Sequence, residues 1–190
     1  MEMTGALPPL EHKFARLGGG GTGGLVVADG LRIEGYASLF GQVDQGGDVV
    51  RAGAYAGSLA RRGAGSVKLL WQHDPREPIG VWDEVREDAT GLHVRGRLLD
   101  GIARGREAAA LIAAGAIDGL SIGYRTIRAV KDEAGRRVLS ELELWEVSVV
   151  TFPMLEGARL GSAKGAVPGQ GRLLRWATML DEARNSLRER

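Results

Sequence analysis

The chain has 190 residues, enough for one domain with a hydrophobic core and short extensions. Its 25 lysines and arginines nearly balance 24 aspartates and glutamates, so the net charge of +1 gives no electrostatic reason to expect nucleic acid or a membrane surface as a partner. Cysteine is absent, which excludes disulfides, thiolate metal sites and a cysteine nucleophile. No apolar run approaches the ~20 residues of a membrane span and the first residues lack a secretory layout, so we expect a cytoplasmic protein.

The chain begins with a glycine-rich stretch. Its glycine run at 18–24 neither follows a strand nor opens a helix, as a dinucleotide-binding loop must. We therefore expect a flexible N-terminal extension over residues 1–30 and no cofactor. Apolar and polar residues alternate over 31–39, which predicts a half-buried strand. A glycine-punctuated loop should follow, and then a short helix over 54–62 that ends at Gly63.

The middle of the chain is predicted to contain five more strands and one helix. The strands are expected over 66–74, 78–88, 91–100, 119–130 and 136–152, and the alanine-rich helix over 103–115. Trp71 and His73 should share one face of the first of these strands, which Pro75 and Pro78 should end because proline has no backbone N–H. Short connections favour antiparallel neighbours. The predicted fold class is mainly β with helical insertions (α+β), a mostly antiparallel closed β-barrel of about six or seven strands over residues 31–160.

The end of the chain changes character. Residues 161–171 are rich in glycine and alanine and are expected to form a linker. In residues 172–190, Leu173, Trp176 and Leu180 recur at spacings of three and four, which predicts an amphipathic C-terminal helix. Two arrangements remain open, because this helix could dock on a partner or pack on its own barrel.

Residues 119–123 read G-L-S-I-G, which matches the hydrolase nucleophile motif G-x-S-x-G. The hydroxyl of Ser121 is a weak nucleophile until a neighbouring base takes its proton. The three histidines, His12, His73 and His93, all precede Ser121 in the sequence. The α/β-hydrolase order, in which histidine follows serine, is therefore excluded, whereas orders with histidine first remain.

Each candidate also has an ordinary structural interpretation. His73 stands at the end of an apolar strand before a proline-containing loop, where scaffolds present reactive groups, or it is a structural histidine. His93 alternates with Arg95 and Arg97 on the polar face of its strand, so we expect it to be solvated. Ser121 is either a nucleophile or a small residue beneath a helix.

A carboxylate could complete the set. Glu146 lies in an apolar strand, where burying a charge is costly unless it is paired, so it is either exposed or bound to a group such as an imidazole N–H. Other carboxylates compete, and the residues alone do not choose among them: Glu141, Glu143, Asp44, Asp48 and Asp74. The histidines show no paired ligand spacing, so no metal site is expected, and no pair of carboxylates is spaced to suggest a glycosidase.

Five segments are informative as an ordered set. They are GYASLFGQVDQGGDVVRAGAY, LLWQHDPREPIGVW, GLHVRGRLL, LIAAGAIDGLSIGYR and LELWEVSVVTFP. Together they resemble the tailed-phage prohead protease family, whose members are capsid-maturation serine peptidases with a fold similar to herpesvirus assemblin. The resemblance covers about residues 31–160. It departs from the family at FPMLEGARL, where a Pro-Ala step is more usual, so the resemblance does not define the residue at which the domain ends.

The resemblance implies a role for three residues. Ser121 matches the nucleophile, His73 the base and Glu146 the acidic third member. Backbone N–H groups near Ser121 would hold the oxyanion, and Arg125 is a further candidate helper because of its proximity in sequence.

The resemblance also implies a function and partners. We expect a serine endopeptidase that acts in the host cell within the assembling prohead, where it cleaves segments of the major capsid protein and scaffold, and finally itself. The fold resemblance suggests self-association as a homodimer, and the C-terminal helix is expected to dock on scaffold or capsid protein. The alternative is a non-enzymatic β-barrel that serves as an assembly or scaffolding protein of the particle, and a third hypothesis is a metal-dependent hydrolase.

Overall fold

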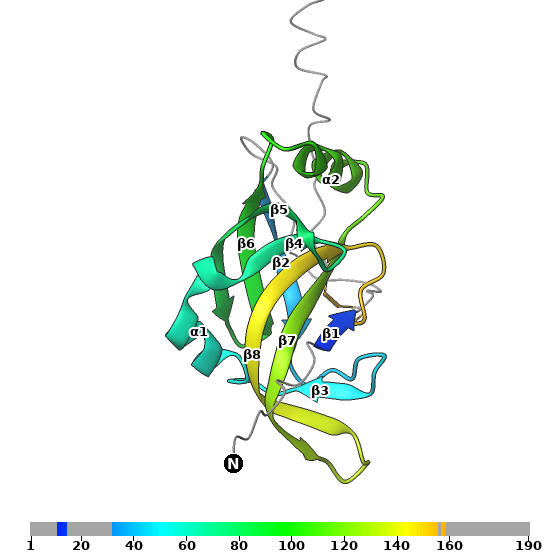
Figure 1. The fold of residues 1–190 in the computed structure, drawn as a ribbon. Helices are drawn as coiled ribbons and strands as arrows, with labels where there is room; N and C mark the ends of the chain where they lie inside the picture. The colour runs from blue at the N-terminus through cyan, green and yellow to red at the C-terminus, as the bar shows by residue number, and fades with distance from the viewer. Residues whose placement is uncertain (1–10, 15–31, 156, 159–190) are drawn as a thin grey trace, which may run out of the picture.

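The computed structural model describes residues 11–14, 32–155 and 157–158. In chain order its elements are β1 (Glu11–Phe14), β2 (Arg32–Leu39), β3 (Asp48–Val50), α1 (Ala56–Arg62), the 3-10 turn η1 (Ala64–Ser66), β4 (Lys68–Trp71), β5 (Asp74–Glu87), β6 (Gly91–Leu98), α2 (Ala103–Ala113), β7 (Gly119–Lys131) and β8 (Arg137–Val150). Figure 1 shows α1 and α2 at separate places outside a strongly curved sheet. The prediction of a mainly β protein with helical insertions is confirmed. None of the helices described is long and apolar enough to span a membrane.

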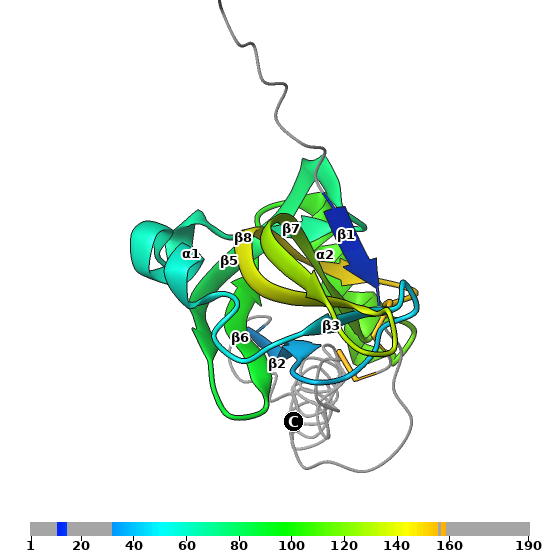
Figure 2. The same ribbon diagram turned by 90° about the horizontal axis from the view of Figure 1, so that it is seen from below.

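The strands form one eight-stranded mixed sheet in the order β1-β7-β8-β4-β5-β6-β2, with β3 also paired to β8. The predicted closed, mostly antiparallel barrel is wrong on closure and direction. The predicted number of about six or seven strands over residues 31–160 agrees with the seven strands β2 to β8, and β1 lies before that range. The sheet is an open half-barrel (Figure 2), and both β3 and β4 run parallel to β8. Connection length predicts the direction of strands that follow one another. It predicts the antiparallel pairing of β8 with β7, but it carries no information on the pairing of β8 with β3 and β4, which lie far earlier in the sequence.

Several strand boundaries differ from the sequence prediction. β4 ends at Trp71, and β5 begins at Asp74, so Pro75 and Pro78 lie inside a strand instead of ending one. The short strands β1 and β3 fall in segments expected to be an extension and a loop. The predicted linker over 161–171 and helix over 172–190 lie outside the described residues.

The hydrophobic core draws on strands from both halves of the sheet. Ile33 of β2, Leu92 of β6, Leu120 of β7 and Val147 of β8 are each at most 2% exposed, and Ala108 adds a buried methyl group from α2. Full burial of one such aliphatic side chain stabilises a fold by roughly 1.5–3 kcal/mol. The core therefore anchors β7 and β8, the two strands that carry Ser121 and Glu146.

Asp88 organises the turn between β5 and β6. Its Oδ1 accepts the backbone N–H groups of Thr90 at 2.8 Å and Gly91 at 3.2 Å. Its Oδ2 accepts the hydroxyl of Tyr36 at 2.8 Å and the guanidinium of Arg86 at 2.9 Å. Burial alone would raise the pKa of this carboxyl, but the hydrogen bonds outweigh it and lower the pKa from 3.8 to about 2.

Replacing Asp88 by alanine should lower the free energy of unfolding by about 1–2 kcal/mol at pH 7, because several donors lose a charged acceptor. The folded-state pKa of Asp88 lies below the unfolded value. Its contribution is therefore present at neutral pH and is lost as the pH falls from about 4 towards about 2. Urea denaturation of both proteins across this range measures the effect. The exposed Asp100→Ala should behave as wild type, and an Asp88→Ala difference that did not change with pH would contradict the assignment.

Candidate active site

The pairing of β7 with β8 places three polar side chains and one glycine on the same face of the sheet. Ser121 stands opposite Ser148, and Gly123 stands opposite Glu146. Residues two apart in a strand, and residues directly opposite on neighbouring strands, point to the same face. Ser121 is 1% exposed and Glu146 is 3% exposed, so both lie in the interior.

His73 reaches this face from the tight turn between β4 and β5. Trp71 pairs with Asp74, which leaves Gln72 and His73 as the two central residues of a hairpin turn. Both have positive φ, 51° and 62°, as a type I′ turn requires. The predicted placement of His73 on the face of a strand is therefore wrong. Left-handed backbone costs a residue with a side chain roughly 1–2 kcal/mol, so surrounding contacts must hold this turn.

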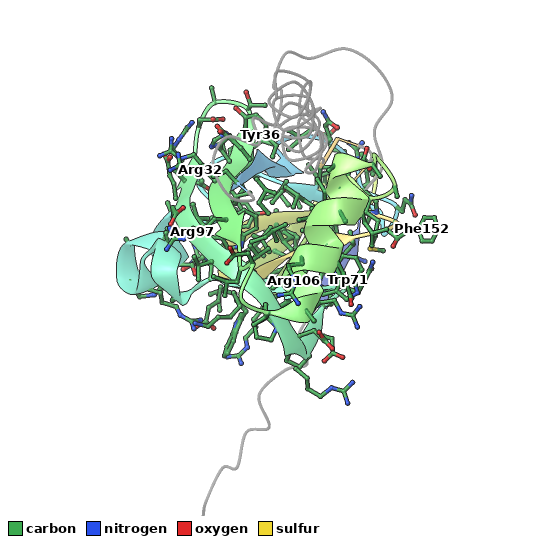
Figure 3. All side chains as sticks on the ribbon, turned by 90° about the horizontal axis from the view of Figure 1, so that it is seen from above. Arg32, Tyr36, Trp71, Arg97, Arg106 and Phe152 are labelled. Atoms are coloured by element: carbon green, nitrogen blue, oxygen red, sulfur yellow. The ribbon has the colours of Figure 1, made fainter. Side chains whose placement is uncertain are left out.

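Gln72 supplies such contacts. Its backbone N–H donates to the carbonyl of Val149 at 3.0 Å, which extends the parallel pairing of β4 with β8. Its side-chain Nε2 donates to Thr151 Oγ1 at 2.7 Å, and the Thr151 N–H donates to Gln72 Oε1 at 3.3 Å. Phe152 follows directly, is 78% exposed and projects outward in Figure 3. The turn that carries His73 is thus tied to β8 and to the segment after it.

The structure brings Ser121, His73 and Glu146 together. His73 Nε2 lies 2.8 Å from Ser121 Oγ, and His73 Nδ1 lies 2.5 Å from Glu146 Oε1. A carboxylate can only accept, so we assign the ring proton to Nδ1, which leaves the lone pair of Nε2 free to accept the Ser121 hydroxyl. The side chains of His73 and Glu146 are only 7% and 4% exposed. This arrangement can remove a proton from Ser121 and hold the resulting imidazolium beside a negative charge.

Two residues that the sequence analysis did not assign to the site support Glu146. The hydroxyl of Ser148 donates to Glu146 Oε2, the oxygen that His73 does not use. A Cβ atom on Gly123 would lie 2.2 Å from Glu146 Oε1, so the carboxylate occupies the space that any larger residue would need. The alternation of Glu146 with Ser148 in an apolar strand is a signal that could have identified the serine.

The competing carboxylates near His73 in sequence, or before Ser121, have other partners. Asp74 accepts the guanidinium of Arg76 at 2.8 Å and the Arg76 backbone N–H at 2.9 Å, and these contacts lower its pKa to about 2. Asp48 forms an ion pair with Arg137. Asp44 accepts the backbone N–H of Asp48 at 2.9 Å in a turn. Glu146 is thus the carboxylate that contacts His73.

Arg125 does not lie where the sequence analysis suggested. Its guanidinium is 3.5 Å from Glu143 Oε2 and stacks over Trp145 at 5.4 Å from the ring centre. Arg125 is four residues beyond Ser121 on β7, about 13 Å along the strand. Its placement gives it a structural role in holding Glu143 and Trp145 together.

His93 is buried, so the expectation that it is solvated is wrong. It is 9% exposed, and its Nε2 lies 3.0 Å from Glu34 Oε1. It stands opposite Tyr36 on β2, and the two rings meet edge to face at 5.1 Å between centres. Pairing with β2 covers this part of β6, which the alternation pattern alone does not reveal. For His12, which lies in β1, the structure gives only a backbone position, opposite Gly123 of β7.

In the ranges that the structure describes, no three His, Asp or Glu side chains are grouped as ligands of one ion.

We expect Gly123→Ala to displace the Glu146 carboxylate from His73, because the new methyl group would overlap Oε1. The low-field NMR resonance of the His73 Nδ1 proton should shift upfield or disappear, and stability should fall by roughly 1–3 kcal/mol. Gly65→Ala is a matched control, since open space surrounds that position. An unchanged resonance in a folded Gly123→Ala protein would show that the carboxylate does not depend on this glycine.

Comparison with known proteins gives a consistent result. The chain is 35% identical over 138 residues to the prohead protease of Enterobacteria phage HK97, and 31% identical over 136 residues to that of Escherichia phage T5. Each alignment covers 70% of this chain, which spans 60% and 63% of the length of these two relatives. The solved structure of the bacteriophage T4 capsid assembly protease superposes with a TM-score of 0.55 over 79% of this chain and 99% of that one. At 17% identity this likeness shows a shared fold.

The model of the protein family described as caudovirus prohead serine protease matches residues 26–167. This range includes all three converging residues. The chain therefore belongs to the caudovirus prohead serine protease family.

Proposed function

We propose that the chain is a serine endopeptidase in which Ser121 is the nucleophile, His73 the general base and Glu146 the residue that orients the base. One observation carries this proposal: the unbroken path from Ser121 Oγ through His73 to Glu146, with contacts of 2.8 and 2.5 Å. Catalytic triads are defined by such geometry and by the role of each member. Because the chain belongs to a serine protease family, we interpret this geometry as that of a catalytic triad.

The reaction follows from these contacts. Ser121 Oγ attacks the carbonyl carbon of the scissile peptide while His73 Nε2 takes the hydroxyl proton. The proton then passes from Nε2 to the leaving amine as the C–N bond breaks, which leaves an ester on Ser121. Water attacks this ester with His73 again as base, and the free hydroxyl returns. Glu146 keeps the proton on Nδ1 and stabilises the imidazolium formed in both steps.

The oxyanion of the tetrahedral intermediate needs hydrogen-bond donors near Ser121. We assign this role to backbone N–H groups and leave out Arg125, because its guanidinium contacts Glu143 and Trp145.

The substrate class is proposed from the names of the relatives. Two are prohead proteases and one is a capsid assembly protease. We infer that this chain cleaves segments of the major capsid protein and scaffold inside the assembling prohead in the host cell, and that it also cleaves itself. Self-association as a homodimer is part of the same proposal.

Ser121→Ala should reduce cleavage of a co-expressed capsid or scaffold protein by a factor on the order of 10⁴ to 10⁶, with little change in stability because the hydroxyl is small. His73→Ala should cause a comparable loss. Mass spectrometry of the co-expressed protein measures the products, and a fluorophosphonate should label Ser121 in the wild type. Ser140→Ala removes a hydroxyl on β8 that donates to the Arg128 carbonyl on β7, away from the three converging residues, and should leave cleavage unchanged. Cleavage by Ser121→Ala, or normal particle assembly without any labelling, would favour a non-enzymatic assembly protein.

Glu146→Gln should reduce kcat by a factor on the order of 10³ to 10⁴, because an amide cannot stabilise the imidazolium and can favour the wrong tautomer. Asp74→Asn should have a much smaller effect, since Asp74 pairs with Arg76 on the surface. The ratio of the two losses, measured with one substrate, tests which carboxylate serves His73. A greater loss for the Asp74 variant would reverse the assignment.

A further inference from the structure

Phe152 is the most exposed large apolar side chain in the part of the chain that the structure describes. Its exposed fraction is 78%, whereas the next, Val130, is 51% exposed. Figure 3 shows the ring standing clear of the fold. Isolated apolar residues are common on protein surfaces, so the place at which this ring is held decides what it can do.

The residue before it, Thr151, attaches Phe152 to the turn that carries His73. Thr151 Oγ1 accepts a hydrogen bond from Gln72 Nε2 at 2.7 Å, and the Thr151 N–H donates to Gln72 Oε1 at 3.3 Å. Gln72 directly precedes His73, and both are central residues of that turn. Phe152 therefore follows a residue that is bonded to the neighbour of His73.

The residue after it, Pro153, attaches Phe152 to the strand that carries Ser121. Pro153 is buried, and a Cβ atom on Gly119 would lie 2.7 Å from its Cδ. Gly119 and Ser121 are two residues apart on β7, so they point to the same face of the sheet and lie roughly 7 Å apart. Pro153 thus packs on the face of β7 on which Ser121 lies.

These two attachments place Phe152 at the rim of the candidate active site. Ser121 is 1% exposed and the side chain of His73 is 7% exposed, so a peptide reaches them only from the surface around them. An extended peptide advances about 3.3 Å for each residue, so side chains near the scissile bond come within reach of this rim. A phenyl ring gains most from an apolar partner, because contact removes both surfaces from water.

We propose that Phe152 is a specificity-determining residue that packs against an apolar side chain of the substrate near the scissile bond. The substrate is then an extended peptide with an aliphatic or aromatic residue within about four positions of the bond that is cut. A charged residue in that position would lose water against the ring without gaining a hydrogen bond, so it would be selected against. This inference rests on the peptidase function proposed above.

The test is a double-mutant comparison in the full chain. The substrate is a fluorescent peptide that spans the cleavage site found by mass spectrometry, and its apolar residues near the bond are replaced by alanine one at a time. Phe152→Ala removes the ring, and Phe152→Leu keeps an apolar side chain. Val130→Ala is the control, because it removes the next most exposed apolar side chain at the far end of β7 from Ser121. Fluorophosphonate labelling of Ser121 reports separately on the triad.

Alanine at one of these substrate positions should lower kcat/KM of the wild type about tenfold, mainly through a higher KM. Phe152→Ala should lose about tenfold with the parent peptide and little more with that alanine peptide, because both changes remove the same contact. Phe152→Leu should recover most of the loss, and Val130→Ala should match wild type. All four proteins should be labelled at the same rate.

Losses that add for every peptide, or no loss, in a normally labelled Phe152→Ala protein would overturn the inference and leave the peptidase proposal intact. Slower labelling of Phe152→Ala would also overturn the inference, because the ring would then act through the geometry of His73 and not by touching substrate. Absence of labelling in wild type would overturn the peptidase proposal and this inference with it.

A second measurement does not depend on turnover. The chain has three phenylalanines, so para-fluorophenylalanine can be introduced at all of them, and the fluorine NMR signal of residue 152 is identified by its absence in Phe152→Leu. Binding of the parent peptide to the Ser121→Ala protein should shift this signal. It should leave that of Phe40, which stacks on Tyr55 at 6.3 Å between ring centres. No shift at residue 152 when the peptide saturates the protein would overturn the inference.

Discussion

A carboxylate held inside a β-sheet determines the arrangement of the residues around it. Glu146 is 3% exposed, and an unpaired charge at such a depth would destabilise the fold by several kcal/mol. The imidazole of His73 and the hydroxyl of Ser148 each bind one of its oxygens, and Gly123 leaves the space that the side chain fills. The left-handed turn at Gln72 and His73 persists because β4 is paired with β8, which sets the imidazole over the carboxylate.

Much of the fold follows from local pattern. Alternation of apolar and polar residues located β2 and β4, the turns between apolar runs located β5, β6, β7 and β8, and alanine content with a closing glycine located α2. The sheet topology could not be predicted, because β8 joins strands that are distant in sequence and no loop sets their direction. Two strands were missed because segments as short as Asp48–Val50 carry too little periodicity to detect.

Only part of the candidate site could be predicted from the residues alone. Chain order excluded one hydrolase class, and the cost of an unpaired buried charge made Glu146 conspicuous, but the choice of carboxylate needed the family resemblance. The positive φ of His73 has no sequence signal, since neither central residue of its turn is glycine. For His93 the sequence pattern is misleading. His93 lies on the polar face of an alternating strand, yet it is buried beside Tyr36 of the neighbouring strand.

The parallel pairing of β4 with β8 has a consequence for the timing of activity during biosynthesis. His73 is translated long before Glu146 and Ser148, and the two groups meet only when β8 has been made and has docked. Any nascent or truncated product that ends before β8 lacks the partner that orients its imidazole. If the peptidase function proposed above holds, we expect a fragment that ends before β8 to be inactive, because it lacks the carboxylate that contacts His73.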